Sequence, residues 1–251
     1  MATLQQAPTK KRLAFVIDQS RCIDCRACLV ACRSEWNVPE GQTRIWVHSD
    51  GPQGQFPKVW QSYVPAQCHH CEDPWCVDAC PTGATFKRES DGLVLIDSEA
   101  CIGCGLCVNA CPYQARFRNV ETGKAEKCNG CVTRIEAGEK PACVATCIGG
   151  SRMFGDLNDP NSDVSKAIAG RAYYRPVTDE VNTRPMTLYL QPPDASAVQV
   201  TPQPRPPVSA ETFWHVVALP LVKFAVGAAF AGQAVAFVYQ LIKGENEFKE
   251  A

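Results

Sequence analysis

Sixteen cysteines, which fall into four groups of four with none left over, constrain this 251-residue chain more than any other feature. Groups one and three read C-x2-C-x2-C-x3-C, group two reads C-x2-C-x4-C-x3-C, and group four reads C-x2-C-x11-C-x3-C. In chain order the groups are Cys22, Cys25, Cys28 and Cys32; Cys68, Cys71, Cys76 and Cys80; Cys101, Cys104, Cys107 and Cys111; and Cys128, Cys131, Cys143 and Cys147.

The spacing of groups one and three is typical of loops that hold cubane iron–sulfur clusters. Iron prefers soft thiolate sulfur, and a tight loop with a cysteine at every third position directs three sulfurs toward one centre. The fourth cysteine lies on the helix that follows and reaches a second cluster. Groups two and four are stretched variants that share a proline two residues before the third cysteine and the continuation Cys-Val-x-x-Cys. The sequence therefore predicts [4Fe–4S] clusters.

Other uses of the cysteines fit less well. Disulfide scaffolds are typical of short secreted chains, and the N-terminal residues show neither an apolar signal segment nor a twin-arginine pair. Zinc sites favour two C-x2-C pairs rather than the spacing of groups one and three. The net charge of −1 and the pI of about 6.4 disfavour binding to nucleic acid.

An internal repeat organises the cysteine groups. Groups one and three each follow a short apolar segment, Leu13–Val16 and Leu93–Leu95, which we expect to be a strand. Groups two and three are joined by a predicted hairpin that turns at Asp91-Gly92, as in a two-cluster ferredoxin. Groups two and three therefore form one predicted module, residues 61–111, and groups one and four form the other, residues 12–60 and 112–175.

The chain resembles the four-cluster iron–sulfur subunits of DMSO reductase-type complexes, which include DMSO, polysulfide, tetrathionate and nitrate reductases and membrane formate dehydrogenases. The resemblance covers about residues 12–190 and rests on the cysteine groups and on three motifs. These are Gln67-Cys68-His69-His70-Cys71, Cys80-Pro81-Thr82-Gly83-Ala84 and Cys101-Ile102-Gly103-Cys104.

The resemblance implies four [4Fe–4S] clusters with nested ligand sets. The sets are Cys22, Cys25, Cys28 and Cys147 (set one); Cys32, Cys128, Cys131 and Cys143 (set two); Cys68, Cys71, Cys76 and Cys111 (set three); and Cys80, Cys101, Cys104 and Cys107 (set four). It also implies a non-catalytic subunit that relays single electrons. The implied partners are a catalytic subunit of the molybdopterin or multihaem type and a polytopic quinone-binding membrane subunit of a respiratory complex.

Several residues near the cysteines have two interpretations. His69 and His70 lie between two cysteines, and because the cysteine sets are complete we expect them to pack near the clusters rather than bind iron. Trp75 is expected to pack in the core. The three arginines that flank group one could tune a potential, dock a partner or be solvated surface charge, and the sequence leaves this open. They are Arg21, Arg26 and Arg33.

The C-terminal third has a different composition. Residues 176–210 are proline-rich and predict an extended tether, whereas residues 211–243 are apolar enough for a transmembrane helix. Residues 1–11 and 244–251 are expected to be a flexible tail and a charged tail.

We therefore predict an α+β fold of two interleaved bacterial ferredoxin-like modules with a C-terminal transmembrane helix that enters the lipid bilayer. The chain would be associated with the cytoplasmic (inner) membrane of a prokaryote, with its clusters on either the periplasmic or the cytoplasmic side. The alternative is a freestanding polyferredoxin that serves soluble enzymes, against which the apolar helix argues.

Overall fold

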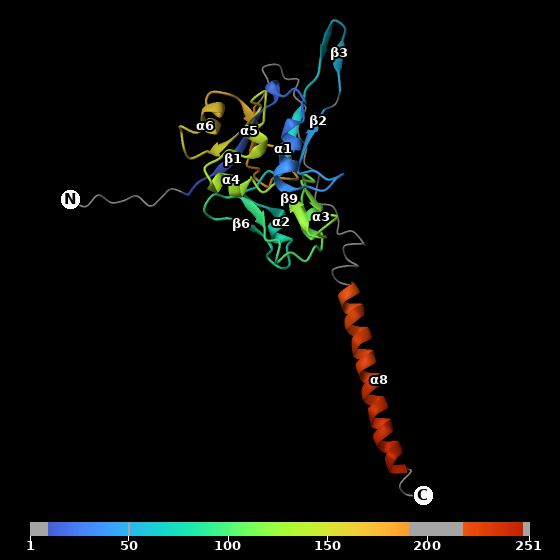
Figure 1. Cartoon of the computed structure of the whole chain (residues 1–251). Coiled ribbons are helices and arrows are strands. Elements are labelled where there is room, and N and C mark those ends of the chain that lie inside the picture. Colours follow the sequence, from blue (N-terminus) through green and yellow to red (C-terminus); the bar gives the residue numbers. More distant parts are fainter. Residues whose placement is uncertain (1–9, 50, 191–217, 248–251) are drawn as a thin grey trace, which may run out of the picture. The chain divides into compact units, whose positions relative to one another are not determined.

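The computed structural model describes residues 10–49, 51–190 and 218–247 (Figure 1). The chain divides into a cysteine-bearing unit, through residue 206, and a C-terminal unit from residue 207 onward. Most of the predicted N-terminal tail, the tether beyond residue 190 and the last four residues of the charged tail lie outside the described residues.

A four-stranded sheet contains both the first and the last strand of the described part of the cysteine-bearing unit. Its strand order is β10 (Arg152–Asp156), β1 (Leu13–Asp18), β12 (Thr187–Leu190) and β11 (Tyr173–Tyr174). β1 runs antiparallel to β10, with Phe15 opposite Phe154, and parallel to β12, with Phe15 opposite Thr187. All six residues of β1 are buried, which confirms the strand predicted before group one.

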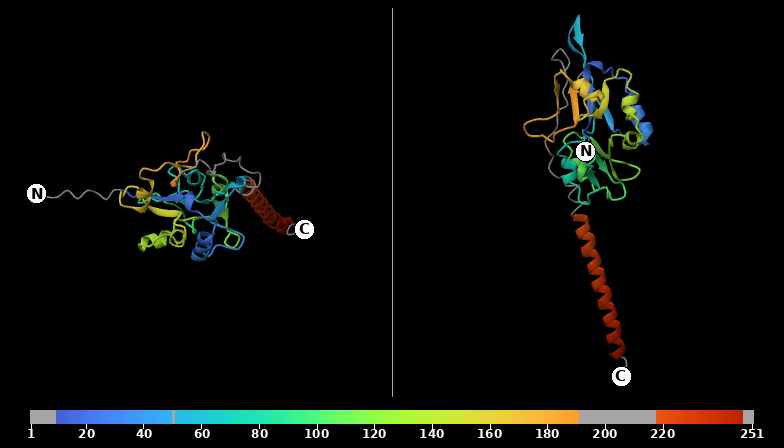
Figure 2. Two further views of the ribbon diagram at one scale, coloured as in Figure 1. Left: turned by 90° about the horizontal axis from the view of Figure 1, so that it is seen from above. Right: turned by 90° about the vertical axis from the view of Figure 1, so that its left-hand side faces the viewer.

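Four antiparallel pairs make up the other sheets. They are β2 (Ile45–His48) with β5 (Val64–Gln67), β3 (Gln53–Gln55) with β4 (Lys58–Trp60), β6 (Thr85–Lys87) with β7 (Val94–Ile96), and β8 (Arg116–Arg118) with β9 (Ala125–Lys127). The β6–β7 pair is the hairpin that the sequence predicts between groups two and three. The β3–β4 hairpin projects from the cysteine-bearing unit (Figures 1 and 2).

Five short helices accompany the cysteine groups, and a sixth follows β10 in the described part of this unit. The five are α1 (Ala27–Trp36), α2 (Trp75–Asp78), α3 (Leu106–Asn109), α4 (Val132–Glu136) and α5 (Ala142–Ala145); the sixth is α6 (Asp163–Ile168). A 3-10 turn, η1 (Gln19–Arg21), precedes group one. α1 packs against α5, and α2 packs against α3. Helices from groups one and four are thus neighbours, as are helices from groups two and three, and Figure 1 shows the two pairs in different halves of the unit.

The core of this unit is built partly from the cysteines themselves. One buried cluster contains Phe15, Ile45 and Tyr113 together with five cysteines, which are Cys28, Cys32, Cys68, Cys128 and Cys143. A second cluster, beneath α6, joins Val16 of β1 to Leu188 of β12 and Val164. The described elements confirm the mixed helix and strand content of the prediction.

The structure differs from the predicted tether at residues 187–190. These residues form β12, whose four side chains are all buried in the four-stranded sheet. Pro185 and Pro192 favour an extended, proline-rich tether through this region. The segment between them includes Thr-Leu-Tyr-Leu, which is apolar and favours a strand.

The C-terminal unit contains the helix α8 (Leu219–Glu247). Residues 221–243 form a segment of 23 residues with a mean hydropathy of 1.8 and exposed side chains, so its length and composition suit a membrane span. At 1.5 Å per residue this segment is about 35 Å long, enough for a hydrocarbon core of about 30 Å. α8 extends four residues into the predicted charged tail, and residues 211–217 of the predicted span lie outside the described residues.

Candidate metal centres

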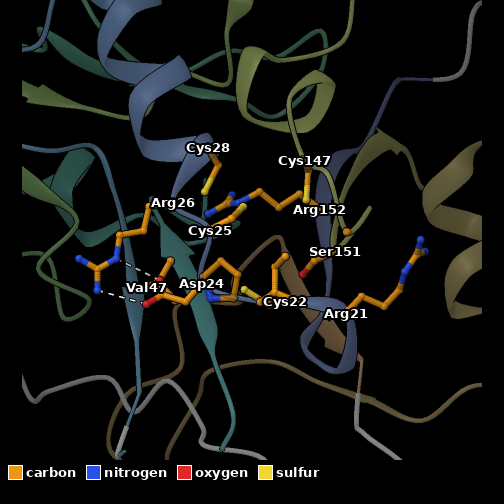
Figure 3. A pocket seen from close by; sticks show the side chains of 13 residues that line it. Arg21, Cys22, Asp24, Cys25, Arg26, Cys28, Val47, Cys147, Ser151 and Arg152 are labelled. Atoms are coloured by element: carbon orange, nitrogen blue, oxygen red, sulfur yellow. Dashed lines mark hydrogen bonds and ion pairs between the residues drawn. The ribbon is translucent and has the colours of Figure 1, made fainter.

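Four cysteines that are far apart in the sequence line one pocket. Cys22 and Cys25 come from the loop between η1 and α1, Cys28 lies in the first turn of α1, and Cys147 follows α5. Figure 3 shows these four side chains turned toward the same space. The packing of α1 against α5 brings Cys147 to this loop. The residues lining this pocket therefore include all four cysteines of set one.

A second pocket is lined by all four cysteines of set four. Cys101 and Cys104 come from the loop before α3, Cys107 lies in α3, and Cys80 follows α2. The backbone N–H of Thr85 donates a hydrogen bond of 3.4 Å to the Cys80 sulfur. Burial alone would raise the pKa of Cys80, but hydrogen bonds from Thr85 and Thr82 outweigh it and the pKa is lowered.

Among the remaining eight cysteines, the four of set two are buried, whereas in set three Cys68 is buried and the other three are half-buried. Burial raises the pKa of Cys32 to about 12, and the neighbouring Cys143 and Cys131 add to the shift. Burial likewise raises the pKa of Cys111 to about 11, with Cys68 and Cys76 as its cysteine neighbours. Thiols buried in this way remain protonated near neutral pH unless a metal displaces the proton.

The donor set fits iron–sulfur clusters. Each of the two pockets offers four cysteine sulfurs, which is the ligand set of a cubane. Among the described residues, no three His, Cys, Asp or Glu side chains gather closely enough to bind a single metal ion.

The loops of groups one and three share one backbone pattern, which explains how each directs its sulfurs inward. Asp24 and Arg26 have positive φ angles of 51° and 56°, and the equivalent Gly103 and Gly105 have 68° and 79°. At Gly103 glycine is required, because a Cβ there would lie 2.2 Å from the carbonyl oxygen of Gly123.

Polar groups donate hydrogen bonds to several of the buried sulfurs. The Trp36 indole N–H donates to Cys131 at 3.3 Å, and the Thr183 hydroxyl donates to Cys71 at 3.1 Å. Such bonds stabilise negative charge on sulfur and tune the clusters that the sulfurs bind. The sequence analysis did not identify Thr183, which lies outside every cysteine group and has no motif around it.

Both predicted packing histidines are buried, with exposed fractions of 1% for His69 and 2% for His70. The ring of His69 lies edge-on to Tyr113 with centroids 4.4 Å apart, and His70 Nδ1 accepts a hydrogen bond from the Val94 N–H. Burial lowers the pKa of His69 to about 3, so the ring is neutral. The expected packing is confirmed for the histidines, whereas Trp75 is half-buried and not part of the buried core.

The three arginines that flank group one are exposed, whereas two other arginines are buried. Arg21, Arg26 and Arg33 all lie at the surface, and Arg26 pairs with Asp24 at 3.1 Å. Arg116 and Arg152 are only 4% and 2% exposed. Neither was predicted from the sequence, although each stands five residues after the last cysteine of its group, which are Cys111 and Cys147.

Comparison with known proteins identifies the family. Two models of 4Fe-4S dicluster domains match residues 21–84 and 59–157. The chain is 43% identical over 188 residues to a subunit of the tetrathionate reductase of Salmonella typhimurium, covering 74% of this chain and 75% of that protein. It is 42% identical over 165 residues to protein NrfC of Escherichia coli, covering 65% and 74% of the two chains.

A third relative, a subunit of the sulfite dehydrogenase of Allochromatium vinosum, is 38% identical over 201 residues, covering 71% of this chain and 82% of that protein. The ferredoxin-like character of the fold and the resemblance seen in the sequence are thereby confirmed. This chain belongs to the 4Fe-4S dicluster family of iron–sulfur electron-transfer subunits of reductase complexes.

Proposed function

We propose that this chain relays single electrons through four [4Fe–4S] clusters between a catalytic subunit of the molybdopterin type and a quinone-reactive membrane subunit of a respiratory complex. The observation that carries the proposal is the pair of pockets, each lined by four cysteines that match one set proposed from the resemblance. A cysteine distant in sequence completes each pocket, which a chance cluster of thiols would not explain.

All sixteen cysteines are iron ligands in this proposal, in the four nested sets given above. The packing of α1 on α5 and of α2 on α3 supports the nesting. In set two, the pKa of Cys32 is raised by burial and, to a smaller extent, by Cys143 and Cys131, which lie near it. In set three, the pKa of Cys71 is raised by burial and, to a smaller extent, by Cys68, Cys111 and Cys76.

The clusters would supply one-electron redox chemistry, and the residues of this chain would hold them in a spatial series. Cys68 of set three belongs to the same buried core as Cys128 and Cys143 of set two. Sets one and four line the two described pockets at the ends of this series. The order of transfer is therefore set one, two, three and four, in either direction.

The two end pockets carry exposed apolar residues suited to partner contacts. Ile23, in the loop of set one, is 64% exposed, and Ile102, at the equivalent position in set four, is 66% exposed. Ile148 beside Cys147 is 78% exposed. Exposed apolar side chains around a redox centre favour a protein interface over open solvent. We assign the set-one end to the catalytic subunit and the set-four end to the membrane subunit.

Membrane association rests on α8. Its apolar segment, residues 221–243, would enter the cytoplasmic membrane of a prokaryote, and Tyr239 near its end is a residue type common at membrane interfaces. A freestanding polyferredoxin would have no use for this helix.

Purification of the tagged chain from gently solubilised membranes, followed by mass spectrometry, tests the proposal. We expect a molybdopterin-type subunit and a polytopic membrane subunit to copurify with it. The matched control is the same chain with Ile23→Asp and Ile148→Asp, which keeps every cysteine and should lose the catalytic subunit while it retains the membrane subunit. Recovery of the unaltered chain alone in the soluble fraction would contradict the proposal and favour a polyferredoxin.

A further inference from the structure

Arg152 is a buried cation at the boundary between two cysteine sets. It lines the pocket of set one, where Figure 3 shows its side chain extending toward Cys25 and Cys28. Its charge also acts on Cys32 and Cys143 of set two. One guanidinium N–H donates to the amide oxygen of Gln67 at 2.8 Å, whereas Nε and Nη2 have no hydrogen-bond partner among the described residues.

Arg116 has the same environment in the other module. Burial alone would lower the pKa of Arg116, but Cys76, Cys68 and Cys111 of set three and Cys107 of set four outweigh it and the pKa is raised. One N–H donates to the Thr85 hydroxyl at 3.1 Å, and Nε and Nη2 again lack a partner in the described part of the chain. Thr85 in turn donates its backbone N–H to Cys80, so hydrogen bonds link the arginine to set four.

The two arginines occupy equivalent places in the internal repeat. Each stands five residues after the last cysteine of its group and is the first residue of a strand, β8 for Arg116 and β10 for Arg152. Their hydrogen-bond partners, Thr85 and Gln67, are neutral, and no ion pair with a carboxylate is found for either among the described residues.

A buried guanidinium without an anionic partner is strongly unfavourable, so these positions require negative charge nearby. Burial alone would lower the pKa of Arg152, but the neighbouring Cys143 and Cys28 outweigh it and the pKa is raised. A cluster with four cysteine thiolates has a net negative charge, which increases when an electron is added. Two such clusters would therefore supply the counterion of each arginine.

We propose that Arg152 and Arg116 are positioning charges that raise the reduction potentials of the clusters, each acting on both clusters of its own module. The inference rests on the proposed function, because it requires loaded clusters. Each transfer adds one electron to one cluster and removes one from its neighbour or from a partner subunit, and no bond forms or breaks. The fixed guanidinium charge offsets the added negative charge, so no proton needs to accompany the electron.

Redox titration of the purified complex, followed by electron paramagnetic resonance, tests the proposal. Arg152→Gln should disfavour reduction of the two clusters of sets one and two by about tenfold, which is 59 mV for a one-electron couple, and leave the other two unchanged. Arg116→Gln should do the same to sets three and four only. Arg152→Lys and Arg116→Lys, which keep the charge, should recover most of the shift.

An exposed arginine is the matched control. Arg118 lies two residues after Arg116 at the exposed end of β8. Because solvent and salt screen exposed charges, Arg118→Gln should change each equilibrium less than about twofold.

Iron content is measured on every variant, so that a change of potential is separated from a loss of clusters. Unchanged potentials in fully loaded glutamine variants, or equal shifts in all four clusters, would overturn the proposal. Loss of iron from the lysine variants as well as the glutamine variants would assign the arginines a structural role and overturn it too. Fewer than four clusters in the unaltered chain would contradict the proposed function instead.

Discussion

Cys147 and Thr183 illustrate how residues far along the chain complete the cluster sites. Cys147 follows α5 and lines the pocket of the first cysteine loop, and Thr183 donates to Cys71 from a segment that precedes β12. Neither contact joins residues of the same sequence motif. Both depend on the C-terminal half of the unit folding back onto the cysteine loops of the N-terminal half.

Substitution of single cysteines tests the proposed sets. Cys147→Ser and Cys25→Ser should weaken or remove the same electron paramagnetic resonance signal, because both residues are assigned to set one, and each should lose up to about four irons per chain. Cys80→Ser is the control and should affect a different signal. If Cys147→Ser removed the signal that depends on Cys80, the nested assignment would be wrong.

Thr183→Val tests the hydrogen bond to sulfur. Loss of the O–H donor removes stabilisation of negative charge on Cys71, so the cluster of set three should become harder to reduce by about 0.5–1.5 kcal/mol. The potential of that cluster is measured by redox titration. Thr122→Val, at an exposed threonine of the β8–β9 turn, should leave every potential unchanged. An unchanged potential in Thr183→Val would show that the bond has no such role.

The cysteines could be recognised from sequence because their spacing is itself the signal for a metal loop. Arg116, Arg152 and Thr183 could not, because their importance depends on burial and on contacts across the fold. A weak signal did exist for the arginines, namely their shared position five residues after a cysteine group. It stands out only once the structure shows that both side chains are buried.

At the scale of elements, β12 ties the end of the cysteine-bearing unit to its beginning. It pairs in parallel with β1, which leads into the first cysteine loop, and its Leu188 packs on Val16 and Val164. The strands before groups one and three were predictable from short apolar runs next to the cysteines. β12 was not, because flanking prolines obscured a four-residue strand that depends on its neighbour β1 for stability.

Leu188→Ala tests this role of β12. Leu188 is 1% exposed, and truncation of a buried leucine lowers the free energy of unfolding by about 2–5 kcal/mol. The denaturant midpoint of the cluster-loaded protein, followed by circular dichroism, should fall accordingly. Val120→Ala is a control at a side chain that is 72% exposed, and its midpoint should not change. Equal midpoints for the two variants would mean that β12 does not support the unit.

Removal of α8 tests its assignment as a membrane anchor. A chain that ends after residue 206 retains the whole cysteine-bearing unit. Washing membranes with alkaline carbonate, which strips peripheral proteins, should release the shortened chain and leave the full chain in the bilayer. Release of the full chain under the same wash would contradict a transmembrane α8 and leave the helix to be explained by contact with a partner.

At the scale of the whole molecule, two interleaved modules share one core made largely of cysteine side chains. α1 and α5 bring groups one and four together around the module of groups two and three, whose helices α2 and α3 also pair. Within this core, burial raises the pKa of Cys143 to about 11 and that of Cys32 to about 12. Metal binding, which displaces those protons, is therefore coupled to folding of the entire unit.

A count of iron and acid-labile sulfide per chain in the anaerobically purified protein shows whether the sixteen cysteines hold four cubane clusters. We expect roughly sixteen irons and sixteen sulfides per chain, four of each for every cluster. About eight irons and eight sulfides per chain, or zinc in place of iron, would contradict the assignment of four cubane clusters.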